Sequence, residues 1–378
     1  MTALEVSFAD VRDEVQRSQA AKGIAEDYER RFRTLGPSEW SSYQHQLDAA
    51  IVRLLDSSLS SDQLGGLELI LELTHCDASV HDFTRVTNFA NYLRQPLASS
   101  DAAVAARASH CLGQLARAEG GHAAVKPALD QALRRLKEGN RLDSAVLVLV
   151  QLAEHAPTLT YVHLSEICDH LWTAIRDPRV STRQGAAAVL RACLALVASR
   201  PGHARERWYA RVYDEAQKGL ASGASTEIVH GALLTIAELL DAPGARLTER
   251  QLDTLFEGAW ACRNHRDKAV RRAVLDVPPR MAAHCERSSV EEVHRGAKLN
   301  LFESNFLNGS VALMLTALRS PPYQELRHLV FQAIGEIALH TKATIHSRQE
   351  PLQPLHRRAT APSSNPRKGS IFGAGPSV

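Results

Sequence analysis

The string His265-Arg266-Asp267 is the part of the chain that most directly suggests chemistry. In phosphoryl-transfer enzymes an aspartate in such a loop accepts the proton of the substrate hydroxyl, and an asparagine five residues later holds a metal ion. Position 272 is arginine here, and the sequence has no glycine-rich strand, metal-binding Asp-Phe-Gly or paired lysine. We therefore interpret Asp267 as a helix N-cap, which accepts hydrogen bonds from the first backbone N–H groups.

Neighbouring cysteines and histidines raise the question of a metal site, at His75-Cys76, His110-Cys111, Cys262 with His265, and His284-Cys285. Adjacent helical residues point about 100° apart, whereas structural zinc needs four converging ligands. We expect buried or capping residues here, with no metal and no other cofactor. The six cysteines share no framework spacing, so we also expect reduced thiols rather than disulfides.

Residues 86–97 form the better candidate for a functional surface. Val86, Ala90, Leu93 and Leu97 share one face at helical spacing, and we expect that face to pack inward. The remaining faces carry the candidate partner-binding residues, which are Asn88, Asn91, Tyr92, Arg94 and Gln95. Tyrosine and arginine are over-represented among interface hot spots. The alternative is an ordinary solvated helix face.

Two further candidates lie in residues 342–378, a basic segment rich in proline and serine. Thr360 follows Arg357-Arg358 and Ser370 follows Arg367-Lys368, patterns typical of kinases that prefer basic substrates. Phosphorylation would cancel much of the local positive charge. The segment has too little apolar periodicity to order itself, so we predict a disordered tail, and a plain basic linker is the alternative.

A repeated apolar block predicts the elements that position these residues. It occurs as Ile70-Leu71-Glu72-Leu73, Leu112-Gly113-Gln114-Leu115, Leu149-Val150-Gln151-Leu152, Leu190-Arg191-Ala192-Cys193, Ile236-Ala237-Glu238-Leu239 and Ile334-Gly335-Glu336-Ile337, with a weaker copy near Val277. Successive copies start 42, 37, 41, 46, 41 and 57 residues apart, which brackets the length of helical-pair repeats. Such pairs bury their apolar faces only by stacking, so the prediction is an all-α solenoid of HEAT/armadillo-like repeats.

Start signals place the helices within the repeats. Ser100-Asp101 precedes a stripe of Val104, Ala108, Leu112 and Leu115, so Asp101 is a predicted N-cap. Asp177-Pro178 predicts a second start, with Asp177 as cap and Pro178 at the first helical position. The buried stripe expected there consists of Val180, Ala187, Leu190 and Leu194.

The predicted division of the chain has three parts. An amphipathic capping helix occupies residues 1–36, the solenoid residues 37–341 and the tail residues 342–378. Pro278-Pro279 interrupts one repeat, and proline inside a helix removes a hydrogen bond. We therefore expect the helix to kink or end there, with an inserted helix near residues 290–307.

Charge and hydropathy exclude several classes of partner. The formal net charge is only +2 over 378 residues with mixed signs, which does not favour nucleic acid. The longest apolar run, residues 186–198, is broken by Arg191 and is shorter than the roughly 20 residues that span a bilayer. Since the N-terminus shows no secretory pattern, we expect a cytoplasmic protein.

Several blocks resemble a known family more specifically. They are Asn88-Phe89-Ala90-Asn91-Tyr92-Leu93-Arg94, residues 145–149, 188–194, 208–219 and 230–234, Ala261-Cys262-Arg263-Asn264, and Pro279-Arg280-Met281-Ala282. Their combination and order over roughly residues 40–340 resemble the N-terminal HEAT solenoid of the target-of-rapamycin (TOR) kinases, serine/threonine kinases related to phosphatidylinositol kinases.

The resemblance implies a non-catalytic scaffold in nutrient-responsive growth signalling. In that family this region contributes to homodimer assembly and contacts raptor or its counterparts and a Ras-like GTPase, so we expect protein partners and peripheral association with endomembranes through them. The kinase domain of the family lies C-terminal to such a segment. The alternative is a free-standing HEAT adaptor, either a phosphatase scaffold or a transport carrier.

Overall fold

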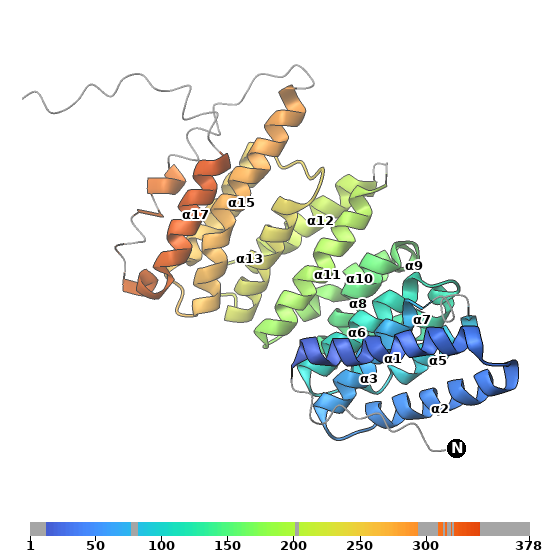
Figure 1. The fold of residues 1–378 in the computed structure, drawn as a ribbon. Coiled ribbons are helices and arrows are strands. Elements are labelled where there is room, and N and C mark those ends of the chain that lie inside the picture. Colours follow the sequence, from blue (N-terminus) through green and yellow to red (C-terminus); the bar gives the residue numbers. More distant parts are fainter. Residues whose placement is uncertain are drawn as a thin grey trace, which may run out of the picture.

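The chain folds into a curved row of paired helices in a computed structural model (Figure 1). The structure describes residues 13–76, 82–200, 204–293, 309–312, 314–315, 319 and 321–340, and none of these is in a β-strand. The prediction of an all-α solenoid is confirmed for these residues. The predicted tail, with Thr360 and Ser370, lies outside them.

Seven helices stack one after another and form what we call the main row. They are α3 (Ser60–Thr74), α6 (Ala102–Arg117), α8 (Leu142–His155), α11 (Val180–Ala198), α13 (Thr226–Asp241), α15 (Lys268–Val293) and α17 (Arg327–His340), among the described residues. Each packs against the next. The contacts are therefore local in sequence, as in other repeat arrays.

A second layer of helices flanks the main row. It consists of α2 (Pro37–Leu55), α5 (Phe83–Tyr92), α7 (Gly121–Glu138), α10 (Leu164–Ile175), α12 (Ala204–Gly219) and α14 (Glu249–Ala261), in the described part of the chain. The short elements η1 (Pro96–Ala98), α9 (Pro157–Val162), η2 (Cys262–Asn264) and η3 (Pro321–Leu326) lie in the connections. Before them all, α1 (Glu14–Thr34) packs on α3 at the N-terminal end of the row.

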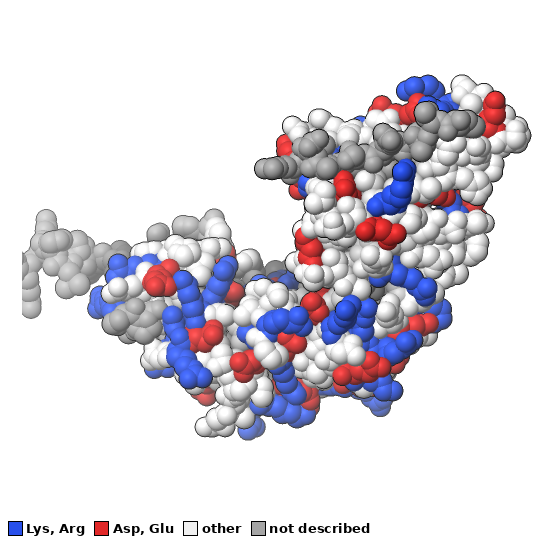
Figure 2. Space-filling view, turned by 90° about the horizontal axis from the view of Figure 1, so that it is seen from below, with Lys and Arg blue, Asp and Glu red and all other residues white. Residues whose placement is uncertain are grey.

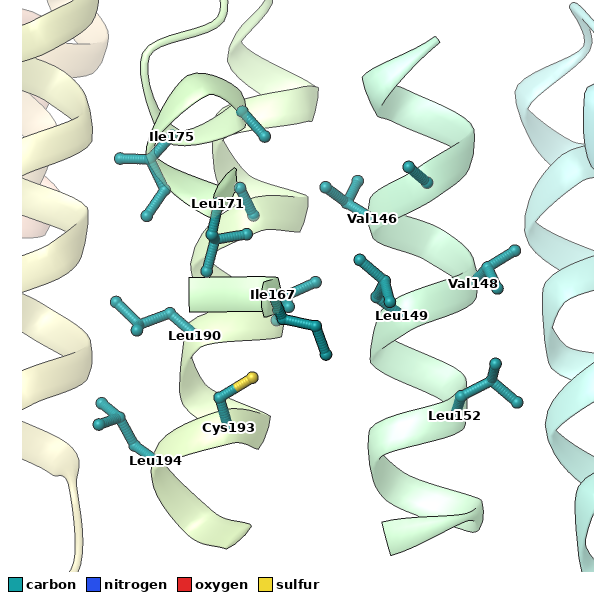
Figure 3. Close-up of a cluster of buried hydrophobic side chains, with 14 of the residues drawn as sticks. Val146, Val148, Leu149, Leu152, Ile167, Leu171, Ile175, Leu190, Cys193 and Leu194 are labelled. Atoms are coloured by element: carbon teal, nitrogen blue, oxygen red, sulfur yellow. The ribbon is translucent and has the colours of Figure 1, made fainter. Parts of the chain in front are cut away.

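The repeated apolar blocks form the core of the main row. Their leading residues fall one in each of the seven helices, and Ile70, Leu112, Leu149, Leu190 and Ile236 are fully buried. Figure 3 shows the junction of α8 with α10 and α11, where Val146 and Leu149 face Ile167 and Cys193. Complete burial of such side chains contributes about 1.5–3 kcal/mol each.

The predicted N-cap at Asp101 is confirmed, and the predicted N-cap at Asp177 is displaced from the start of its helix. Asp101 Oδ1 accepts from the backbone N–H groups of Ala103 and Val104, at 2.8 and 3.4 Å. Asp177 instead accepts from the N–H of Arg179, and α11 begins only at Val180. Val180 is 39% exposed, so its place in the predicted buried stripe was wrong, because the helix starts two residues later than Pro178 suggested.

The sequence predicted that a helix kinks or ends at Pro278-Pro279. The helix does not end there, since α15 runs unbroken from Lys268 to Val293. The prolines deprive the carbonyls of Val274 and Leu275 of their usual donors. Both prolines are buried, and α15 packs between α13 and α17, so tertiary packing holds the helix together across the lost bonds. The start of the predicted inserted helix, residues 290–293, belongs to α15, and residues 294–307 lie outside the described part.

Candidate protein-interaction surface

The predicted partner-binding residues lie on α5 and the turn that follows it. Asn91, Arg94 and Gln95 are exposed, while Asn88 and Tyr92 are half-buried. We call these five residues the α5 patch. Tyr92 therefore offers only part of its ring to a partner. Its other part packs against Phe89, with ring centroids 6.4 Å apart.

Local sequence explains where α5 begins and ends. Asp82 accepts a hydrogen bond from the N–H of Arg85 at 3.1 Å and so caps the helix. The helix ends at Tyr92, earlier than the apolar spacing to Leu97 suggested, and the chain turns into η1 at Pro96. Because Leu93 and Leu97 are still buried, this turn remains anchored while Arg94 and Gln95 project into solvent.

A buried arginine supports the α5 patch from beneath. The side chain of Arg85 is 3% exposed, and its guanidinium lies 3.1 Å from Asp48 of α2. It also lies over the rings of Tyr28 and Phe89, at 5.0 and 4.8 Å from their centroids. A buried charge needs such partners to offset its desolvation. Arg85 thus ties α5 to α1 and α2.

The contacts around Arg85 change the pKa values of Asp48 and Tyr92. Burial raises the pKa of the Asp48 carboxyl, and the positive charge of Arg85 opposes that shift. Burial likewise raises the pKa of Tyr92, with a further upward contribution from Asp48. Tyr92 is therefore a neutral phenol at neutral pH, and it can donate a hydrogen bond to a partner. The sequence reasoning missed Arg85, although its spacing of four from Phe89 on an apolar stripe was a usable signal.

Ion pairs join neighbouring helices of the main row. Arg107 of α6 contacts Glu68 of α3 at 2.6 Å, and Arg191 of α11 makes two bonds of 2.7 Å to Glu238 of α13. Both glutamates are almost completely buried. Burial raises the pKa of Glu68, and Arg107 counteracts this. These pairs hold successive helices together, and on the face seen in Figure 2 the two signs of charge are interspersed.

The string His265-Arg266-Asp267, which first suggested catalysis, forms the loop and the N-cap at the start of α15. Asp267 accepts from the N–H groups of Ala269 and Val270, at 2.7 and 3.2 Å, and caps α15 as predicted. Burial alone would raise the pKa of Asp267, but these backbone hydrogen bonds outweigh it and lower the pKa. Arg271 donates to the carbonyls of His265 and Arg266, which fixes the loop.

The described residues contain no group of three or more His, Cys, Asp or Glu side chains placed to hold a metal ion. The six cysteines are free thiols, five of them buried and Cys262 half-buried. Among the described helices, none has both the length and the apolar character needed to cross a bilayer.

Comparison with known proteins gives matches over most of the chain. It is 33% identical over 317 residues to the serine/threonine-protein kinase TOR of Arabidopsis thaliana, which covers 82% of this chain. It is 31% identical over 329 residues to the TOR kinase of Oryza sativa, and 28% over 340 residues to tor1 of Schizosaccharomyces pombe. The chain is homologous to the N-terminal helical-repeat region of the TOR kinases.

This TOR-like chain spans only 12 to 14% of the length of those three relatives. No protein-family model matches it. Among solved structures, the karyopherin Kap121p bound to the extreme C-terminus of Cdc14p aligns with 87% of the chain at a TM-score of 0.58 and 14% identity. Kap121p bound to RanGTP aligns with 87% at a TM-score of 0.52. These likenesses confirm the helical-repeat fold.

Proposed function

We propose that this chain is a non-catalytic scaffold in TOR-type growth signalling, which contributes to complex assembly and docks regulatory subunits. The observation that carries the proposal is the 33% identity to a TOR kinase over 317 residues, in a chain whose described residues form a stacked array of helical pairs. The partners are raptor-like subunits and, at a second contact, a Ras-like GTPase. Such a scaffold works in the cytoplasm and reaches endomembranes through its partners.

The α5 patch is the proposed docking surface. Asn91, Arg94 and Gln95 offer exposed polar side chains next to the partly exposed ring of Tyr92. The buried contacts of Arg85 hold α5 firmly against α1 and α2, so a partner meets a surface that is already ordered. Preorganised surfaces of this kind lose less conformational entropy on binding.

The test is the affinity of the full chain for a purified raptor-like subunit, measured by calorimetry. Asn91→Ala with Arg94→Glu and Gln95→Ala should raise the Kd at least about tenfold, the loss expected from removing hot-spot contacts. The matched control is Arg134→Glu with Lys137→Glu, on the exposed side of α7. Equal affinity for both variants and the unchanged protein would remove the α5 patch from the proposal.

The predicted phosphorylation of Thr360 and Ser370 remains part of this proposal as a means of regulation. Mass spectrometry of the native protein from growing and starved cells should find both residues modified in one state and not in the other. The adaptor alternative, a phosphatase scaffold or transport carrier, is supported by the shared helical-repeat fold alone.

A further inference from the structure

A cavity of about 650 Å³ lies where α6 ends, α7 begins and α8 ends. We call it the α7 cavity. Its floor consists of alanines and glycines, and its titratable lining residues are Arg117 of α6, His122 of α7 and His155 of α8, with no acid among the described residues that line it. Two other cavities, which involve α1 and α3, are lined by both acids and bases. The α7 cavity is therefore suited to a negatively charged ligand.

Two glycines fix the floor of the α7 cavity. A Cβ on Gly121 would lie 2.1 Å from the carbonyl oxygen of Leu115, so α7 starts directly against the last turn of α6. Gly120 has a φ of 71°, and a Cβ there would lie 2.3 Å from the ring of Phe83. A side chain at either position would force its surroundings to move. The backbone that forms the floor is thus set by the packing of the two helices.

A third glycine positions His155 on the wall of the α7 cavity. A Cβ on Gly113 of α6 would lie 2.5 Å from the His155 ring, so the imidazole rests directly on the backbone of α6. Gly113 and Arg117 are four residues apart and share one face of that helix. The guanidinium therefore comes near the imidazole. Arg117 is exposed and His155 is half-buried, so both can reach a ligand in the cavity.

The titration of His155 reflects this setting. Burial lowers its pKa, Arg117 and His110 lower it further, and Glu154 opposes them. A bound anion changes this balance, because it favours the protonated imidazole. Among the described residues, none forms a hydrogen bond with the side chains of Arg117, His122 or His155, so all three can turn their donors toward a ligand.

The donors of the α7 cavity match a phosphate group. Arginine donates two parallel N–H bonds to oxyanions, and each imidazole donates one more. A phosphate monoester presents three acceptor oxygens, which suits donors that arrive from three helices. The volume of the cavity lies in the range of small-molecule pockets, so it also holds the group that carries the phosphate. We propose that the α7 cavity binds a phosphate monoester through Arg117, His122 and His155.

The phosphate can belong to a phosphorylated protein side chain or to a small molecule such as a nucleotide, and the experiment distinguishes these sources. The inference does not depend on the α5 patch. Loss of subunit binding in the α5 variant would leave the α7 cavity unaffected, and failure to bind phosphate esters would contradict only this inference.

The first experiment measures the binding of inorganic phosphate, N-acetyl-phosphoserine amide and adenosine 5′-monophosphate to the full chain by calorimetry at constant ionic strength. At least one ester should bind more tightly than inorganic phosphate, and the tighter ester identifies the source. Arg117→Gln should raise its Kd at least about tenfold, because Arg117 supplies the fixed charge.

The matched control is Arg134→Gln, since Arg134 is exposed on α7 and does not line the cavity. This variant should bind the ester as the unchanged protein does. Two results overturn the proposal, namely esters that bind no more tightly than inorganic phosphate, and equal Kd values for Arg117→Gln and the unchanged protein.

The second experiment follows the histidine rings by NMR while the tighter ester is added. The pKa of His155 should rise, because the bound anion stabilises its protonated form. The ring signals of His170, which is half-buried on α10 away from the cavity, are the control and should not move. A His155 pKa that stays constant, or equal changes at His155 and His170, overturns the proposal in favour of unspecific screening.

Discussion

The two ends of the array differ in the surface that they present. α1 is rich in charge, and its ion pairs Arg30–Asp27 and Arg33–Glu29 lie on the helix surface. Its large exposed apolar residues, Val15 and Phe32, lie at opposite ends of the helix. α17 has Phe331 and Leu339 on one face. The exposed surface of α1 is therefore mostly charged, whereas that of α17 is partly apolar.

The largest expected difference between the ends comes from two aromatic residues. Tyr28 of α1 is fully buried, with its ring 4.7 Å from that of Trp40. Tyr28→Ala should lower the free energy of unfolding by about 3–5 kcal/mol. Phe331→Ala should change it by less than about 0.5 kcal/mol, because the ring is mostly in solvent. Urea unfolding of both variants measures this, and similar losses would show that the ring of Phe331 is covered in the folded protein.

A second contrast compares a buried with an exposed ion pair. Arg85→Ala leaves the half-buried carboxylate of Asp48 without its partner, and should cost about 3–5 kcal/mol. Lys268 and Glu325, which join α15 to η3, are 59% and 71% exposed, so Lys268→Ala should cost under about 1 kcal/mol. The control for Arg85 is the double variant Arg85→Met with Asp48→Asn, which should recover part of the lost stability. No recovery would mean that Arg85 acts through its ring contacts.

Acid should act in opposite directions on His230 of α13 and on the carboxyls of Asp48 and Glu68 in α2 and α3. Burial, opposed by a small contribution from Asp267 and reinforced by Arg183, lowers the pKa of His230 in α13 to about 4. The unfolded chain binds this proton near pH 6.5, so the stability that neutral His230 contributes is present above pH 6.5 and is lost as the pH falls toward 4, by roughly 3 kcal/mol at most. The raised pKa values of Asp48 and Glu68 work the other way, because protonation relieves the cost of burying their charges.

The measurement for this contrast is urea unfolding at pH 7.5 and pH 5. The destabilisation that His230 causes at pH 5 should disappear in His230→Gln, whose amide oxygen can still accept from Arg183. A His230→Gln variant with an unchanged pH dependence would assign the effect to another group.

The smallest contrast concerns Gly23 of α1 and Gly335 of α17. Gly23→Ala and Gly335→Ala should each stabilise their helix by about 0.5–1 kcal/mol, because neither Cβ meets a neighbour. Thermal unfolding of both variants measures this gain. A loss of stability in either variant would show that the added Cβ meets a neighbour in the folded protein.

The repeat and its core could be predicted from the sequence because solenoid contacts are local. Every apolar block fell in a helix of the main row, and Asp101 and Asp267 cap helices as expected. The errors arose where tertiary packing outweighs local preference. Pro278-Pro279 stays inside α15 since the helices on both sides hold it, and Asp177 lies two residues before the N-cap of α11, which is Arg179.

The candidate site was less predictable than the fold. The spacing in residues 86–97 correctly indicated that Asn91, Arg94 and Gln95 are exposed. It did not reveal that Arg85 is buried beneath them, because its partners Asp48 and Tyr28 come from helices far away in the sequence.

The stacking of the main row has a mechanical consequence. When each helix leans chiefly on its immediate neighbours, small tilts at successive joints add, and the distance between the ends changes far more than any joint opens. Bridges such as Arg107–Glu68 and Arg191–Glu238 act as stiffeners across individual joints. A ligand bound at both ends of the array would therefore meet an elastic resistance that all of the joints determine together.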